Sequence, residues 1–261
     1  MIEELIDIIR GASSLMIPDG FNIEQKDGCE NIVTSSDLAV QEFLKEKLTS
    51  LIPGCGFICE EETEHDSGKE YVWIIDPIDG TANYSRGIDH CCISVALSHN
   101  GEVIAGVVYS PWRDELYHAE KGKGAFLNGK PIHTSARTFK DSILCCAMST
   151  YRKEFAPVCN DIIMEAYGSI NDLRRFGSAA IELCFLACGQ CELYFEFRLQ
   201  PWDYAAGNII LMEAGGKVTG LDGKLPRYSG PSLVCAGNNE ENQKRLLEII
   251  QRHVPTLPYT K

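Results

Sequence analysis

The stretch VWIIDPIDGTANYSRG, residues 72–87, decides the fold because it joins a buried strand to a rigid acidic turn. The apolar run 72–75 predicts a strand, and the carboxylates of Asp76 and Asp79 follow at its end. Pro77 biases Asp76 toward an extended backbone, while Gly80 permits an unusual turn. Two carboxylates held close together repel each other while both are ionised. A bound divalent cation would remove this cost, and oxygen ligands without His or Cys favour Mg²⁺.

The bulk composition is that of a soluble globular protein. The chain has 261 residues, of which 44% are hydrophobic and 23% charged, enough for one large domain or two modest ones. The net charge of −13 and the lack of a basic stripe argue against binding to nucleic acid. The amino terminus mixes acidic with apolar residues, so it predicts an amphipathic helix and not a secretory signal. No stretch reaches the ~18 apolar residues of a membrane span. We therefore expect a cytoplasmic protein with no membrane or nucleic-acid partner.

The twelve cysteines raise the question of a disulfide or a zinc site. The one CxxC motif, Cys188 and Cys191, could be redox-active or half of a zinc site, but no second CxxC follows and the histidines have no matching spacing. The adjacent pairs 91–92 and 145–146 lie in apolar runs, where strand neighbours point to opposite faces and are badly placed to bond each other. We expect the cysteines to be reduced and to pack as small hydrophobic residues.

The order of elements changes along the chain. After a first helix and a polar loop over 24–31, residues 31–54 predict a short strand, a Ser/Asp cap and a helix, and residues 56–61 and 72–76 predict strands. The region 91–127 predicts an antiparallel meander, with Asn-Gly turns at 100–101 and 128–129. Strands at 143–148, 170–176, 191–197 and 232–237 then alternate with helices at 154–167, 178–189, 202–216 and 239–253. This pattern predicts an α+β protein, one domain over 1–261 whose sub-domains, about 1–138 and 139–261, flank a cleft.

Several separated motifs carry a resemblance to a known family. The segments CEE (59–61), DPIDGT (76–81) and PWDYAAG (201–207) resemble the inositol monophosphatase family of Mg²⁺-dependent, lithium-sensitive phosphatases. The segment NIVTSSD, with Lys26 eleven residues ahead of Asp37, also fits, as do RRFGSAAIEL (174–183) and Glu196, seven residues before Asp203. The resemblance extends over essentially the whole chain. It departs at Cys59, where the family usually has Gly, and this change concerns backbone freedom and not ligand chemistry.

The resemblance implies a fold, a cofactor and an assembly. The fold is the layered αβαβα sandwich of the inositol monophosphatase and fructose-1,6-bisphosphatase superfamily, in a homodimer with two or three Mg²⁺ per subunit. By the family's pattern a first ion is held by Glu60, Asp76 and the carbonyl oxygen of Ile78. A second is held by Asp76, Asp79 and Asp203, and a third, weaker site lies near Glu60.

The resemblance also implies a reaction, the hydrolysis of a small polyol phosphate, most simply myo-inositol 1-phosphate, by water that two metals activate. Thr81 would orient the attacking water, with Asp37 behind it and Glu60 as proton acceptor. The other interpretation of Thr81 is a helix N-cap. The residues expected to contact substrate are Asp79, Gly80, Thr81, Gly177, Ser178, Ala179, Glu196 and Asp203. Glu196 would accept hydrogen bonds from substrate hydroxyls, or would instead pair with Arg198.

Other interpretations stay open. Lys26 either adds positive charge to the site or is a solvated loop residue, and Arg174 and Arg175 fit packing or a subunit interface. Fructose-1,6-bisphosphate, NADP or 3′-phosphoadenosine phosphate are alternative substrates, because the loops that select the substrate, around 150–154 and 168–172, carry no transferable code. A regulatory protein that binds the transcription machinery, with catalysis secondary, is the alternative from another class. The presence of the complete acidic set together with Thr81 favours an enzyme.

Overall fold

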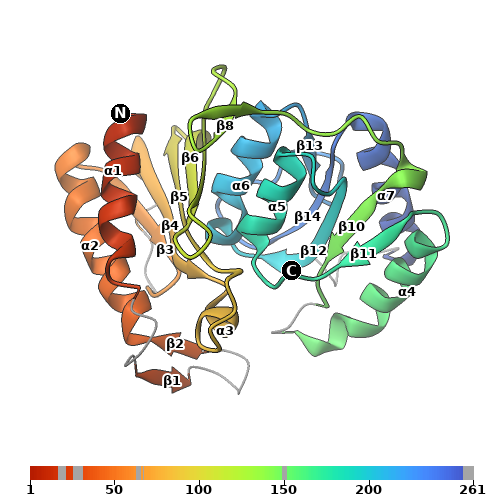
Figure 1. The fold of residues 1–261 in the computed structure, drawn as a ribbon, viewed down its shortest axis with the longest axis horizontal. Coiled ribbons are helices and arrows are strands. Elements are labelled where there is room, and N and C mark those ends of the chain that lie inside the picture. Colours follow the sequence, from red (N-terminus) through yellow and green to blue (C-terminus); the bar gives the residue numbers. More distant parts are fainter. Residues whose placement is uncertain (17–21, 26–31, 63–65, 67, 149–151, 255–261) are drawn as a thin grey trace.

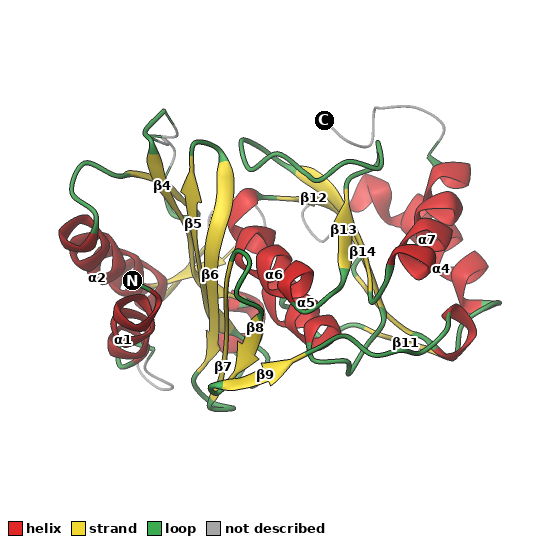
Figure 2. Ribbon diagram, turned by 90° about the horizontal axis from the view of Figure 1, so that it is seen from above, coloured by secondary structure: helices red, strands yellow, loops and turns green. Residues whose placement is uncertain are grey.

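The computed structural model describes residues 1–16, 22–25, 32–62, 66, 68–148 and 152–254, which form five layers in the order αβαβα (Figures 1 and 2). Helices α1 (Ile2–Ser13) and α2 (Ser35–Leu51) cover the outer face of the first sheet. Helices α5 (Ala179–Ala187) and α6 (Pro201–Glu213) fill the space between the sheets, and α4 (Ala156–Tyr167) and α7 (Glu240–His253) cover the second sheet. The α+β class and the layered sandwich expected from the sequence are confirmed.

The first sheet has seven strands in the order β3-β4-β5-β6-β7-β8-β9. Their bounds are β3 (Gly56–Cys59), β4 (Tyr71–Asp79), β5 (Cys92–His99), β6 (Glu102–Ser110), β7 (Glu115–Glu120), β8 (Ala125–Leu127) and β9 (Lys130–Ile132). From β4 onward the neighbours are antiparallel and consecutive, as a meander requires. Both expected Asn-Gly turns are present, with φ of 51° at Asn100 and 49° at Asn128, the left-handed conformation that hairpin turns of this kind need.

The second sheet has five strands in the order β11-β10-β12-β14-β13. Their bounds are β10 (Ile143–Cys146), β11 (Asp172–Arg174), β12 (Leu193–Leu199), β13 (Lys217–Thr219) and β14 (Ser232–Gly237). The connections through α4 and α5 make β10 parallel to both of its neighbours, whereas β14 runs antiparallel to β12 and β13. The sequence pattern missed β13, because a three-residue strand has too few positions to show an alternation.

Some element ends differ from the expectation. Residues 23–25, at the start of the expected polar loop, form β1 (Ile23–Gln25), which pairs with β2 (Ile32–Thr34). The N-cap of α2 is Thr34, and Asp37 completes a capping box with it. The alternative interpretation of Thr81 as an N-cap is wrong, because Gly80 caps α3 (Thr81–Tyr84); Gln200 caps α6, with Asp203 at the third helical position. A carboxylate at the third helical position can take part in a capping box without being the cap itself.

Three hydrophobic clusters fill the spaces between the layers. One lies between α1, α2 and the first sheet, a second surrounds α5 and α6 between the sheets, and a third lies between the second sheet and helices α4 and α7. The expectation of reduced cysteines agrees with the structure, in which every described cysteine is a free thiol and nearly all are buried. Burial raises the pKa of Cys59, Cys91 and Cys159 to about 12, so these thiols are unreactive packing residues.

Each sheet is built from one continuous stretch of sequence, 56–132 for the first and 143–237 for the second. We propose that the chain is one domain with two sub-domains that divide near residue 138, and we refer to them as the N-terminal and C-terminal halves. Within the described residues, no helix has the length and apolar character needed to cross a membrane.

Candidate active site

A local irregularity in β4 brings Asp76 and Asp79 to one face of the first sheet. Residues three apart in a regular strand point to opposite faces. Here Asp76 lies opposite Ser94 and Asp79 lies opposite Cys92, so two residues of β4 face one residue of β5 between them. Such a bulge restores both carboxylates to the same face. The strand therefore continues through Pro77 to Asp79, instead of ending at Asp76 as the sequence predicted.

This face of the sheet is turned toward α6 and the C-terminal half. The hydroxyl of Ser94 donates to the carbonyl oxygen of Trp202, one residue before Asp203 (3.3 Å). Glu60 follows β3, and its N–H donates to the carbonyl oxygen of Ile75 (3.2 Å), which places it beside Asp76. Three segments far apart in sequence thus bring four carboxylates together, those of Glu60, Asp76, Asp79 and Asp203.

The four carboxylates form an electrostatically coupled group. Burial raises the pKa of Asp76 well above its usual range, and the charges of Glu60, Asp79 and Asp203 raise it further. Burial likewise raises the pKa of Asp203, with the charges of Asp79 and Glu60 adding to the effect. The pKa of Asp79 is raised by burial to about 6, although hydrogen bonds from Ser178 and backbone N–H groups oppose that shift. Like charges interact this strongly only where water does not screen them.

The group fits a hard divalent cation. Asp76 is 2% exposed, and its Oδ1 has no hydrogen-bond partner among the described residues. Glu60 and Asp203 are half-buried and remain within reach of solvent. An all-oxygen set with an unpaired buried carboxylate oxygen is the donor chemistry that Mg²⁺ prefers. Within the ranges that the structure describes, no three acidic, His or Cys side chains are spaced as ligands of one metal ion.

Thr81 links the acidic group to a buried aspartate. Its Oγ1 lies 3.0 Å from the carbonyl oxygen of Ile78 and 3.4 Å from Oδ1 of Asp37. Asp37 is fully buried and is fixed by Thr34, whose N–H donates to Oδ2 at 2.8 Å and whose hydroxyl donates at 2.5 Å. A carbonyl oxygen has two lone pairs. The carbonyl oxygen of Ile78 can therefore accept a hydrogen bond from Thr81 and bind a cation at the same time.

The segment before α5, in the C-terminal half, contacts Asp79 directly. The hydroxyl of Ser178 and the N–H of Ala180 donate to Oδ2 of Asp79, at 2.6 and 2.7 Å. The predicted residues Gly177, Ser178 and Ala179 therefore border the acidic group. A carboxylate at a helix N-terminus is stabilised by the helix dipole and by free N–H groups, so Asp79 also anchors α5.

Glu196 joins the same region from β12. It is half-buried, and the hydroxyl of Tyr194 donates to its Oε2 at 2.9 Å. Burial raises the pKa of Glu196 to about 7, while the Tyr194 hydrogen bond opposes the shift and the charge of Asp79 adds to it. Arg198 makes no described ion pair with Glu196, so the alternative of a Glu196–Arg198 pair is wrong for this structure. Its φ of 58° lies in the β12 irregularity between Glu196 and Leu199.

Two residues that the sequence analysis did not single out belong to this site. Asn83 and Glu182 hold the backbone that precedes Ser178, through hydrogen bonds to Phe176 and Gly177. The sequence offers weak signals for them, namely an Asn in the turn after DPIDGT and an acid on the apolar helix α5. Lys26 and residues 150–151 of a predicted substrate loop lie outside the described residues.

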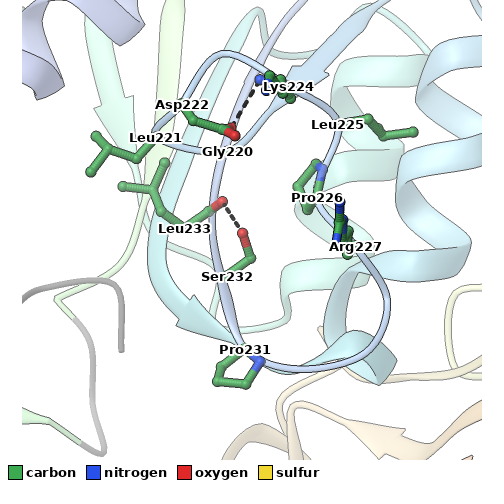
Figure 3. Close-up of a pocket in the computed structure, with 10 residues that line it drawn as sticks. All are labelled: Gly220, Leu221, Asp222, Lys224, Leu225, Pro226, Arg227, Pro231, Ser232 and Leu233. Atoms are coloured by element: carbon green, nitrogen blue, oxygen red, sulfur yellow. Dashed lines mark hydrogen bonds between the residues drawn. The ribbon is translucent and has the colours of Figure 1, made fainter. Parts of the chain in front are cut away.

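A separate cavity lies away from these carboxylates. It has a volume of about 340 Å³ and is lined by residues 220–222, 224–227 and 231–233, from the β13–β14 loop and the start of β14 (Figure 3). No predicted site residue lines it. We place the candidate site at the four carboxylates, because they can hold the cations that neutralise a phosphate. The loop cavity contains none of these residues.

Known proteins of one family resemble this chain along most of its length. A sequence model of the inositol monophosphatase family matches residues 2–255. Inositol-1-monophosphatase of Rhizobium meliloti (strain 1021) is 35% identical over 231 residues, 88% of this chain and 86% of that protein. Nus factor SuhB of Escherichia coli (strain K12) is also 35% identical, over 229 residues, 87% of this chain and 85% of that protein.

A solved structure shows the same arrangement of elements. The extragenic suppressor protein suhB from Bartonella henselae has a TM-score of 0.88 and 28% identity, with 97% of this chain and 99% of that chain covered. The family match spans nearly the whole chain. The chain therefore belongs to the inositol monophosphatase family.

Proposed function

We propose that this protein is a Mg²⁺-dependent phosphatase that hydrolyses the phosphate monoester of a small polyol, with myo-inositol 1-phosphate as the first candidate substrate. The observation that carries the proposal is the coupled group Glu60, Asp76, Asp79 and Asp203 beside the Thr81–Asp37 contact. The names of relatives such as the Rhizobium meliloti inositol-1-monophosphatase support the choice of substrate.

The acidic group would hold two or three Mg²⁺ ions. Glu60, Asp76 and the carbonyl oxygen of Ile78 would hold the first, and Asp76, Asp79 and Asp203 the second, with a weaker third site near Glu60. When bound, such ions neutralise the phosphate, activate a water and stabilise the leaving oxygen. The positive charge of the ions would then let the site attract an anionic substrate, although the protein has a net charge of −13.

The residues around the acidic group would orient the reactants. Thr81 can accept a hydrogen bond from the attacking water while its own proton points to Asp37 or to Ile78 O. Asp37 cannot move away, because the Thr34 capping box fixes both its position and its hydrogen bonding. The half-buried carboxylate of Glu60 would take the proton that the water releases.

The substrate's two ends would meet different parts of the site. The N–H groups of Gly80 and Thr81, at the start of α3, would donate to the phosphate. Gly177, Ser178 and Ala179 would line the polyol side, where Glu196 can accept hydrogen bonds from neighbouring hydroxyls.

A phosphate-release screen tests this function. The substrates are myo-inositol 1-phosphate, fructose 1,6-bisphosphate, NADP and 3′-phosphoadenosine phosphate, each with Mg²⁺ and with EDTA. We expect Mg²⁺-dependent release that is fastest with myo-inositol 1-phosphate and that lithium inhibits. Release from none of the four would refute the proposal. Preference for another ester, or insensitivity to lithium, would keep the phosphatase and replace the substrate by one of the alternatives.

A regulatory role is a second candidate, favoured by the 35% identity to Nus factor SuhB of Escherichia coli. We propose that such a role would act through a protein partner in transcription, because the charge of −13 disfavours direct contact with nucleic-acid phosphates. Recovery of RNA polymerase with the tagged, catalytically inactive Asp76→Asn variant tests it.

We also propose a homodimer, which sedimentation equilibrium would distinguish from a monomer.

A further inference from the structure

Asn83 connects the two halves at the edge of the site. Its Nδ2 donates to the carbonyl oxygen of His90 in the N-terminal half and to that of Phe176 in the C-terminal half, both at 2.7 Å. Asn83 lies two residues after Thr81 on α3, and Phe176 lies two residues before Ser178. One side-chain amide therefore joins the turn that carries Thr81 to the segment that contacts Asp79.

Glu182 holds the same segment from the opposite direction. Its Oε1 accepts from the N–H groups of Phe176 and Gly177, at 2.6 and 2.9 Å. Glu182 is 2% exposed and belongs to α5, which this segment leads into. Phe176 thus has its N–H bound by Glu182 and its C=O bound by Asn83, so both polar groups of its backbone are fixed.

The packing around these bonds leaves little room for movement. The rings of His90 and Phe176 stack with centroids 5.0 Å apart and planes at 13°. A Cβ added to Gly80 would lie 2.8 Å from the carbonyl oxygen of His90, and one added to Gly177 would lie 3.2 Å from Nδ2 of Asn83. Both glycines have positive φ, 87° and 85°, a conformation that side chains disfavour.

From these contacts we infer that Asn83 is a positioning residue, which sets where Gly177, Ser178 and Ala179 lie relative to Asp79 and Thr81. The inference rests on the proposed phosphatase function for its effect on catalysis. Gly177 has no side chain, so what it presents to a substrate is its backbone, which the hydrogen bonds of the segment help to fix. Small displacements of binding groups reduce rates by large factors.

A matched control exists within the chain. Asn238 is 1% exposed, and its Nδ2 also donates to two backbone carbonyl oxygens, those of Ser135 (2.9 Å) and Arg137 (3.0 Å). It lies after β14, and none of the predicted site residues is among its hydrogen-bond partners. Asn238→Ala therefore removes the same chemistry without touching the segment before α5.

The test compares Asn83→Ala with Asn238→Ala. We expect Asn83→Ala to raise KM for the best substrate about tenfold or more, with the Mg²⁺ concentration for half-activation unchanged. Hydrogen exchange of the 176–177 backbone should become faster in Asn83→Ala and stay at the wild-type rate in Asn238→Ala. Asn238→Ala should lower Tm and leave KM within twofold of wild type.

The outcomes separate this inference from the proposed function. Wild-type KM and wild-type exchange in Asn83→Ala would overturn the inference, and so would an equal rise of KM in Asn238→Ala. If Asn83→Ala does not fold, Asn83→Ser keeps one donor and is judged by the same two readouts. If the wild type releases no phosphate, the proposed function fails, and the exchange measurement alone decides whether Asn83 fixes the segment.

Discussion

Asp76 shows at the scale of one residue how stability and function oppose each other. Its carboxylate is buried, one oxygen has no described partner, and three other acids raise its pKa. Asp76→Asn keeps the shape and removes the charge. We expect phosphate release to fall to the level of a no-enzyme control, since the acidic group loses the ligand that both principal ions would share.

The same variant should be more stable without metal. In EDTA we expect the Tm of Asp76→Asn to exceed that of the wild type by several degrees, because a chain of this size gains roughly 2–4 °C per kcal/mol and a buried, repelled charge is costly. With Mg²⁺ the order should reverse. A Tm in EDTA equal to or below that of the wild type would contradict the description of Asp76 as a buried carboxylate that its acidic neighbours destabilise.

Thr81 tests the chemistry without disturbing the acidic group. Thr81→Ala removes the hydroxyl that lies between Ile78 O and Asp37. We expect kcat to fall about 100-fold or more, the effect of losing the correct orientation of a reactant, with Mg²⁺ affinity by titration calorimetry unchanged. Thr81→Ser keeps the hydroxyl and should retain most activity. Equal losses of rate and of metal affinity would mean that Thr81 is structural.

At the residue scale, the sequence predicted the acidic residues and not their support. The rigid turn after an apolar strand indicates Asp76 and Asp79, whereas Glu60 and Asp203 were predicted as ligands through the resemblance to the family. Asn83 and Glu182 are not predictable in this way. The Asn83–Phe176 contact exists only once the two halves meet, and the Glu182 contacts depend on how the segment before α5 turns back toward the helix. An asparagine in a turn is, by itself, no more than a turn residue.

At the scale of elements, α5 depends on two carboxylates that lie on different sides of its first turn. Asp79 binds Ser178 and Ala180 from the first sheet, while Glu182 reaches back from within the helix. Burial raises the pKa of Glu182 to about 8, although hydrogen bonds from Gly177 and Phe176 oppose the shift. The folded protein therefore holds this proton over a pH range in which the unfolded chain has lost it.

This difference predicts how stability changes with pH. Between about pH 4.5 and pH 8 the folded state binds more protons at Glu182 than the unfolded state, so its contribution to stability falls as pH rises. Glu182→Gln removes this contribution and keeps an oxygen for the Phe176 and Gly177 N–H groups. We expect the Tm of the variant, relative to the wild type, to be higher at pH 8.5 than at pH 5. A difference independent of pH would show that Glu182 does not titrate in this way.

The sequence predicted the long helices and strands better than the short strands and the bulge. The strands β4 to β7 and helices α6 and α7 follow from long apolar patterns and Asn-Gly turns, which act over short distances in the sequence. The bulge that aligns Asp76 with Asp79 could not be predicted, because it depends on the register with β5, and so on Ser94 and Cys92. Short strands such as β1 and β13 exist only through pairing with a neighbour.

At the scale of the whole molecule, the site joins the two halves. Glu60, Asp76 and Asp79 come from the first sheet, whereas Asp203 comes from α6, which packs between the sheets. Cation binding should therefore stabilise the layered sandwich and not only one loop. Mg²⁺ at about 100 times its Kd contributes about 2.7 kcal/mol per site, which predicts a rise in wild-type Tm of roughly 5–10 °C or more at this chain length.

Asp203→Asn should reduce the Mg²⁺-induced rise in Tm without abolishing it. The first proposed site does not use Asp203, so the variant should keep roughly half of the Mg²⁺-induced rise in Tm while phosphate release is lost. Asp222→Asn, at an exposed position on the β13–β14 loop, is the control and should keep the full rise. A full rise in Asp203→Asn would exclude Asp203 as a ligand. No rise in the wild type would mean that the acidic group does not bind Mg²⁺, and the two halves would then be joined only by their packing and by contacts such as those of Asp79 and Asn83.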